Sequence, residues 1–97
     1  MVRRRVVVRG SVQGVGYRWA ARDRATALGV SGFVQNRPDG SVFAEVDGEP
    51  GAVDAMVEWM RSGPPGARVT ALETSDIESD GAPDALGDES MGFAIRR

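Results

Sequence analysis

The order in which hydrophobic periodicities change along the chain constrains its fold more than any other feature of the sequence. Segments that are rich in β-branched residues, or in which apolar residues alternate with polar ones, predict strands. Segments in which apolar residues recur every three or four positions predict amphipathic helices. We expect strands at about residues 3–9, 30–36, 41–48, 68–78 and 91–97, and helices at about 17–28 and 49–63.

The first six elements follow one another as strand, helix, strand, strand, helix and strand. This order is a duplicated βαβ pattern, which favours an α+β, ferredoxin-like sandwich with two helices on one face of an antiparallel sheet. The turn at 37–40 joins the second and third strands as a hairpin, because Pro38 fixes φ and Gly40 allows a positive φ. A chain of 97 residues has room for one domain, so residues 1–97 are expected to form a single unit.

The absence of cysteine and histidine from the sequence narrows the chemistry that this chain can perform. Without cysteine there are no disulfides, thiolate metal sites or thiol nucleophiles, and the composition fits a reducing, cytoplasmic compartment. Without histidine the commonest general base and metal ligand are missing. Carboxylates, amides, hydroxyls, arginines and backbone groups remain for chemistry. No apolar run approaches the roughly 20 residues of a membrane span, so no association with a membrane is expected.

The positive charges gather in the N-terminal third of the chain, although the net charge is only −2. Residues 1–37 hold eight arginines and one acid, whereas residues 38–97 hold four arginines and 13 acids. Every basic residue is an arginine, whose guanidinium can grip an oxyanion through two parallel hydrogen bonds. This asymmetry predicts an anionic ligand near the N-terminal third, and either a phosphate group or a nucleic acid would fit.

A glycine-rich segment, RGSVQGVGYR at residues 9–18, links the first strand to the first helix. N–H groups at a helix start lack intrahelical partners and lie at the positive end of the helix dipole, so they can bind an anion. Gly14 and Gly16 can turn consecutive N–H groups inward, and Arg18 can clamp the same anion. The spacing matches neither the Walker motif nor the dinucleotide fingerprint. Taken alone, the segment is either an anion cradle or a tight turn that requires glycine for geometry only.

A second candidate residue is Asn36, which stands at the end of the second predicted strand. Its side chain could reach the glycine loop if the sheet brings the two segments together. It could equally be a turn residue that bonds its own backbone. The sequence pattern leaves both interpretations open, because the order of strands in the sheet decides between them.

These two segments together resemble the signatures of the acylphosphatase family. The first signature is carried by Val8, Gly10, Val12, Gln13, Gly14, Val15, Tyr17 and Arg18, and the second by Gly32, Phe33, Val34, Asn36, Asp39, Gly40 and Val42. The resemblance covers about residues 3–75 and resumes at the final FAIRR. Tyr17 stands where phenylalanine is commoner in the family, so its hydroxyl needs a partner. The acidic stretch at 79–90 looks longer than is usual in the family.

The resemblance implies an acylphosphatase, which hydrolyses the carboxyl–phosphate bond of small acyl phosphates to a carboxylate and inorganic phosphate without a metal. It implies that Arg18 and the backbone N–H groups of the loop bind the phosphate, and that Asn36 orients the attacking water. The loop residues concerned are Gln13, Gly14, Val15, Gly16, Tyr17 and Arg18. A monomer that binds no nucleic acid is expected.

Two other functions compete with this interpretation. The first is a non-catalytic acylphosphatase-like module that binds phosphate or carbamoyl phosphate within a larger carbamoyl-transfer machine. Such modules are usually fused to zinc-finger and transferase segments, and the cysteine-free chain of this length favours the free-standing enzyme. The second is an RNA-binding ferredoxin-like domain, which the basic first third would suit, but the base-stacking strand aromatics of such domains form no recognisable motif here.

Overall fold

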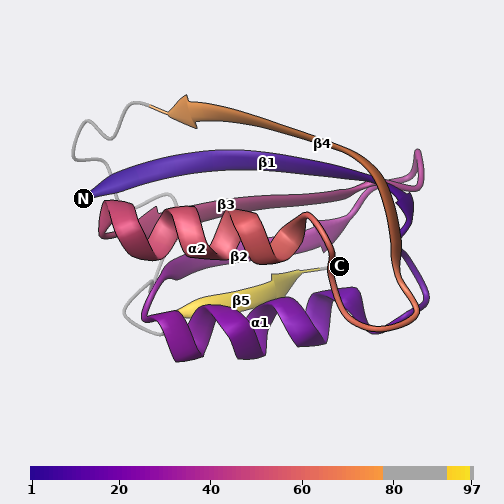
Figure 1. Cartoon of the computed structure of the whole chain (residues 1–97), viewed down its shortest axis with the longest axis horizontal. Coiled ribbons are helices and arrows are strands. Elements are labelled where there is room, and N and C mark those ends of the chain that lie inside the picture. The colour runs from indigo at the N-terminus through magenta and orange to yellow at the C-terminus, as the bar shows by residue number, and fades with distance from the viewer. Residues whose placement is uncertain (78–91, 97) are drawn as a thin grey trace.

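The computed structural model describes residues 1–77 and 92–96 (Figure 1). Its strands are β1 (Val2–Ser11), β2 (Ser31–Asn36), β3 (Val42–Gly48), β4 (Arg68–Ile77) and β5 (Phe93–Arg96), and its helices are α1 (Tyr17–Leu28) and α2 (Pro50–Met60). Every expected strand and helix is present, in the expected order. The acidic stretch 79–90 lies outside the described residues. Neither helix in this part of the chain is long and apolar enough to span a membrane.

The five strands form one sheet in the order β4-β1-β3-β2-β5, and both helices pack on the same face of it (Figure 1). This arrangement confirms the α+β, ferredoxin-like fold. The expectation of a purely antiparallel sheet is wrong in one place, because β2 and β5 run parallel and make the sheet mixed. Without β5, β2 would be an edge strand with open N–H and C=O groups, and β5 covers that edge.

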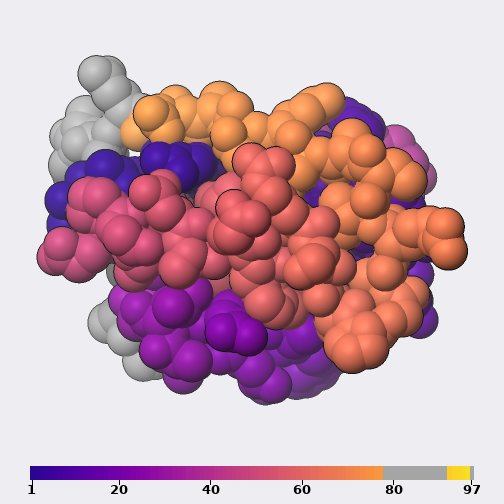
Figure 2. Space-filling model, viewed as in Figure 1, coloured from indigo at the N-terminus to yellow at the C-terminus, as the bar shows by residue number. Residues whose placement is uncertain are grey.

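The hydrophobic core lies between the sheet and the two helices. Alternation along β1 and β3 directs one set of side chains, including Val6, Val8 and Val46, toward the helices, where they are fully buried. The side chains of α1 and α2 hide the middle strands in the space-filling view (Figure 2). The core face of α1 carries the small residues Ala21 and Ala25, which allow the helix to lie close to the sheet. The core face of α2 carries Val53, Met56, Val57 and Met60.

Gly10 belongs to β1 and not to the loop that follows it. The strand continues to Ser11 and pairs with β4, with a register shift between Arg9 and Gly10. The φ angle of Gly10 is 129°, and a Cβ at this position would overlap the carbonyl oxygen of Arg68. Gly10 therefore allows two strand backbones to approach closely. The predicted end of the first strand at residue 9 is too early, because the bulge lets pairing continue past the glycine.

The register of the central strands brings two segments together that are distant in sequence. Val42 of β3 pairs with Val8 of β1 on one side and with Asn36 of β2 on the other. The C-terminal ends of β1 and β2 therefore lie at the same end of the sheet, with only β3 between them. Since neighbouring strands lie about 4.8 Å apart, Val8 lies about 10 Å from Asn36, and the loop begins three residues further along β1 at the same end of the sheet.

Candidate active site

The segment between β1 and α1 presents unpaired backbone N–H groups. Gly14 and Gly16 adopt positive φ angles of 80° and 79°, which glycine reaches without strain. Gly16 is the N-cap residue of α1, and no side chain caps the helix there. The first intrahelical hydrogen bond runs from the N–H of Ala20 to the carbonyl of Gly16, at 3.0 Å. The N–H groups of the three residues before Ala20 have no partner within the helix and can be offered to an anion.

A cavity of about 190 Å³ lies between this loop and the end of β2. Arg18 and Asn36 both line it, so the order of strands in the sheet brings Asn36 to the glycine loop. Gln13 and Val15, which were also predicted to contribute N–H groups, are not among the residues that line it. The lining residues are Val12, Gly14, Gly16, Tyr17, Arg18, Trp19 and Asn36.

Arg18 is held by a strand that lies far away in the sequence. Its Nη1 donates a hydrogen bond to the carbonyl oxygen of Arg96 in β5, at 2.7 Å. A guanidinium has five N–H donors, so this bond leaves others for an oxyanion. The parallel strand β5 thus orients the guanidinium, a contribution that the local motif around Arg18 does not indicate.

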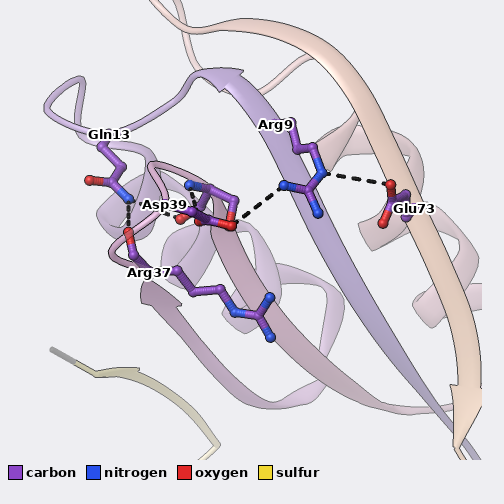
Figure 3. Close-up of polar contacts among 6 residues, drawn as sticks. Arg9, Gln13, Arg37, Asp39 and Glu73 are labelled. Atoms are coloured by element: carbon purple, nitrogen blue, oxygen red, sulfur yellow. Dashed lines mark hydrogen bonds and ion pairs between the residues drawn. The ribbon is translucent and has the colours of Figure 1, made fainter.

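The side chain of Gln13 joins the glycine loop to the turn between β2 and β3 (Figure 3). Its Nε2 donates to the carbonyl oxygen of Arg37 at 2.8 Å and to that of Ser41 at 2.9 Å. Because Arg37 directly follows Asn36, these bonds tie the loop to the strand end that carries Asn36. The sequence predicted only a backbone role for Gln13, and the positioning role of its amide was missed.

Asp39 holds the same turn in shape and connects it to the sheet (Figure 3). Its Oδ1 accepts hydrogen bonds from the N–H of Ser41 at 2.9 Å and from the Ser41 Oγ at 2.6 Å. Its Oδ2 lies 3.5 Å from Arg9, and Arg9 in turn lies 3.6 Å from Glu73 of β4. The hydrogen bonds from Ser41, and then the positive charge of Arg9, hold the pKa of Asp39 below its ordinary value. The ionised carboxylate therefore stabilises the turn beside the cavity.

Tyr17 anchors the start of α1 in the core. Its side chain is buried, its hydroxyl donates to the carbonyl oxygen of Met60 at 2.7 Å, and its ring lies 5.7 Å from that of Trp59. The expected partner for this hydroxyl is therefore confirmed. Burial raises the pKa of Tyr17, so the hydroxyl stays protonated and cannot act as a base at neutral pH.

A wider groove of about 720 Å³ shares three residues with the cavity and is lined by Arg18, Trp19, Arg22, Asn36 and Ile95. Trp19, Arg22 and Ile95 were not predicted as site residues. Arg22 could have been found, because residues four apart lie on the same face of a helix and Arg22 stands four positions after Arg18. Ile95 gives no such indication, since it reaches the groove only through the pairing of β5 with β2.

This protein is thus an α+β, ferredoxin-like domain that carries a glycine loop and an arginine at one end of its sheet. The model of the Acylphosphatase family matches residues 4–85. The chain belongs to the acylphosphatase family, and it is therefore an enzyme.

Individual relatives agree with this assignment. An acylphosphatase from Anaeromyxobacter dehalogenans is 51% identical over 80 residues, which cover 82% of this chain and 86% of that protein. The crystal structure of acylphosphatase from Bacillus subtilis matches with a TM-score of 0.87 and 31% identity, over 100% of both chains. The structure of T.kodakarensis HypF matches with a TM-score of 0.79 and 26% identity, over 100% of this chain but only 12% of that one. Related folds thus occur both in chains of similar size and as a small part of a much longer chain.

Proposed function

We propose that this enzyme hydrolyses the carboxyl–phosphate bond of small acyl phosphates to a carboxylate and inorganic phosphate, without a metal or a cofactor. The observation that carries the proposal is the cavity where the glycine loop, Arg18 and Asn36 meet. Membership of the acylphosphatase family supports the same reaction.

The chemistry of the substrate suits the side chains that this chain has. An acyl phosphate is a mixed anhydride, and its leaving group is a carboxylate with a pKa of about 4. Its departure needs no general acid, so the absence of histidine is no obstacle. Phosphoryl transfer passes through a loose transition state with charge on the equatorial oxygens. The protein mainly has to position the reactants and stabilise that charge.

In the proposed reaction, the loop N–H groups and the Arg18 guanidinium bind the equatorial phosphoryl oxygens. The Asn36 amide orients a water molecule in line with the leaving oxygen. The water oxygen forms a bond to phosphorus while the bond between phosphorus and the acyl oxygen breaks, and that electron pair leaves with the carboxylate. A phosphate oxygen accepts the water's proton, since the described residues that line the cavity include no carboxylate or other strong base.

The test is hydrolysis of benzoyl phosphate in the presence of a chelator, with inorganic phosphate as a competitive inhibitor. We expect turnover to persist with the chelator. Arg18→Ala should lower kcat/KM by about 10³-fold, the order contributed by an arginine that clamps a transferring phosphoryl group. The matched control is Arg24→Ala, because Arg24 lies on the same helix but lines a different cavity. An Arg18→Ala variant that keeps most of its activity would contradict the assigned role.

The second candidate function is a phosphate-binding module that does not turn over. The match to HypF, of which this chain covers only 12%, is the observation that favours it. The same assay separates the two functions. Calorimetric binding of inorganic phosphate by a folded protein that fails to hydrolyse benzoyl phosphate would favour the module.

We further infer that the chain acts as one domain and as a cytoplasmic monomer that binds no nucleic acid. Among the described residues, Met1 and Trp19 are the large apolar side chains that are exposed, so this part of the surface offers no broad apolar patch for a second copy. The sheet aromatics Phe33 and Phe43 are covered by arginine guanidinium groups, at 4.0 and 4.3 Å from the ring centroids. These rings are not free to stack on bases. The cysteine-free composition supports a reducing compartment.

A further inference from the structure

Trp19 stands out among the side chains around the phosphate cavity. Its side chain is 58% exposed, although it lines both the cavity and the wider groove. A large ring that folding leaves in water gains nothing from burial in the core. Aromatic side chains commonly line small-molecule sites, where they contact the ligand. Trp19 therefore marks this groove as a binding surface that continues beyond the phosphate.

Arg22 lies in the same groove and is held in place by Trp19. Its guanidinium carbon is 4.6 Å from the centroid of the Trp19 ring, a cation–π contact that orients the group and leaves the N–H donors at its edge open. No salt bridge within residues 1–77 and 92–96 includes Arg22. Its neighbour in the sequence, Asp23, lines a different cavity. Arg22 thus offers the groove a positive charge that no carboxylate of the described residues neutralises.

The groove of about 720 Å³ is larger than a phosphate group requires, so it has room for the acyl part of a substrate. Arg18 and Arg22 place two cations on one wall, because residues four apart on a helix have Cβ atoms about 5–6 Å from each other. We propose that Arg22 binds a second anionic group on the acyl chain, so that the enzyme prefers acyl phosphates that also carry a carboxylate. Trp19 and Ile95 contact the apolar part between the two anions. This inference rests on the proposed function, in which Arg18 binds the phosphoryl group.

The two walls of the groove suit the geometry of the displacement. Asn36 comes from β2, whereas Trp19 and Arg22 come from α1. A water molecule on the Asn36 amide would attack phosphorus from the side of β2, while the acyl oxygen would leave along α1 in our proposal. An in-line displacement requires this arrangement of the attacking and leaving oxygens.

The experiment compares 4-carboxybenzoyl phosphate with 4-methylbenzoyl phosphate, which have similar shapes but differ in the second anion. We expect the wild-type enzyme to have a higher kcat/KM for the carboxylate substrate than for the methyl substrate. Arg22→Gln should lower the ratio of these two values by about tenfold, the order for a charge-assisted hydrogen bond at a partly exposed site. Activity toward the methyl substrate should fall less than activity toward the carboxylate substrate, since only the carboxylate substrate carries the second anion that Arg22 binds. Comparing the ratio of the two substrates between variants removes the difference in their intrinsic reactivity.

Arg24→Gln is the matched control, because it removes the same charge from the same helix at a residue that faces Trp59 and not the groove. It should leave the preference unchanged. If Arg22→Gln and Arg24→Gln reduce the preference equally, the effect comes from the loss of one positive charge anywhere on the helix, and the inference is wrong. A wild-type enzyme whose preference for the carboxylate substrate is no greater than that of Arg22→Gln would also overturn it.

A binding measurement separates this inference from the proposed function. The probes are 4-carboxybenzylphosphonate and 4-methylbenzylphosphonate, which cannot be hydrolysed, and the readout is their Kd by calorimetry. If the carboxylate probe binds more tightly and Arg22→Gln removes the difference, the second anion site is supported even if no acyl phosphate is hydrolysed. If the enzyme hydrolyses both acyl phosphates with equal kcat/KM and binds both phosphonates with equal Kd, the proposed function stands and the second anion site is refuted.

Discussion

Asn36 is half-buried at the end of β2, where its side chain lines the cavity. None of the side-chain hydrogen bonds among the described residues uses its amide. The interpretation of Asn36 as a turn residue that bonds its own backbone therefore has no support in the structure. Asp39 performs that function in the same turn, by accepting the Ser41 N–H.

Replacing Asn36 tests its proposed role in positioning water. We expect Asn36→Ala to lower kcat by about 10²-fold, the order that a misplaced reacting group costs, while the inhibition constant of inorganic phosphate stays within about threefold of wild type. The measurements are steady-state kinetics with benzoyl phosphate and competition by phosphate. Gln35→Ala is the control, because neighbouring residues of a strand point to opposite faces. A variant that loses phosphate affinity but keeps its kcat would show that Asn36 binds the ground state.

Asp39 gives a prediction about pH, because its pKa is lower in the folded protein than the ordinary value of 3.8. Ionised Asp39 therefore contributes its full stability above that ordinary value, and the contribution is lost as the pH falls through the lower folded-state pKa. We expect Asp39→Asn to be less stable than wild type at neutral pH, and the difference to vanish in acid. Urea unfolding between about pH 7 and pH 2 measures it. Asp23→Asn controls for the change in net charge, and a difference that grows in acid would contradict the prediction.

At the scale of single elements, the pairing of β1 with β4 depends on Gly10. An alanine there meets two obstacles, a positive φ of 129° and overlap with the Arg68 carbonyl oxygen. We expect Gly10→Ala to lower the free energy of unfolding by about 3 kcal/mol, combining backbone strain with overpacking. Gly66→Ala is the control, because Gly66 has a φ of 97° but a Cβ added there would meet no heavy atom within 4 Å, so only strain of about 1 kcal/mol applies. Equal losses for the two variants in urea unfolding would show that the overlap is relieved.

The ends of the two helices depend partly on local sequence and partly on packing. The start of α1 at Tyr17 and its end at Gly29 follow from residues within the segment, because glycine at both caps adopts the left-handed conformation. The predicted end of the second helix at residue 63 is too late, and α2 stops at Met60. Gly63 has a positive φ, and a Cβ at this position would overlap the Tyr17 ring of α1. Glycine therefore allows the chain that leaves α2 to pass close to α1.

At the scale of the whole molecule, the site depends on contacts between segments that are distant in sequence. Gln13 ties the glycine loop to the turn after β2 through its two hydrogen bonds. We expect Gln13→Ala to lower the free energy of unfolding by about 1 kcal/mol. The Arg37 and Ser41 carbonyls each lose one hydrogen bond but still accept a backbone N–H, from Gly40 and from Arg37. It should also reduce kcat, because the loop and Asn36 are no longer held in register. Thermal unfolding and benzoyl phosphate kinetics measure both effects, and an unchanged kcat with lowered stability would limit Gln13 to a structural role.

Sequence reasoning alone predicts the order of strands and helices, the open N–H groups at the start of α1 and the family. These are local properties, since periodicity, the conformational freedom of glycine and motif spacing depend on residues that are close along the chain. Three features emerge only in the folded chain: Asn36 lines the same cavity as Arg18, β5 runs parallel to β2, and the Arg96 carbonyl accepts a hydrogen bond from Arg18. Strand order and register depend on contacts between residues tens of positions apart, and no local pattern records which of those contacts the folded chain makes.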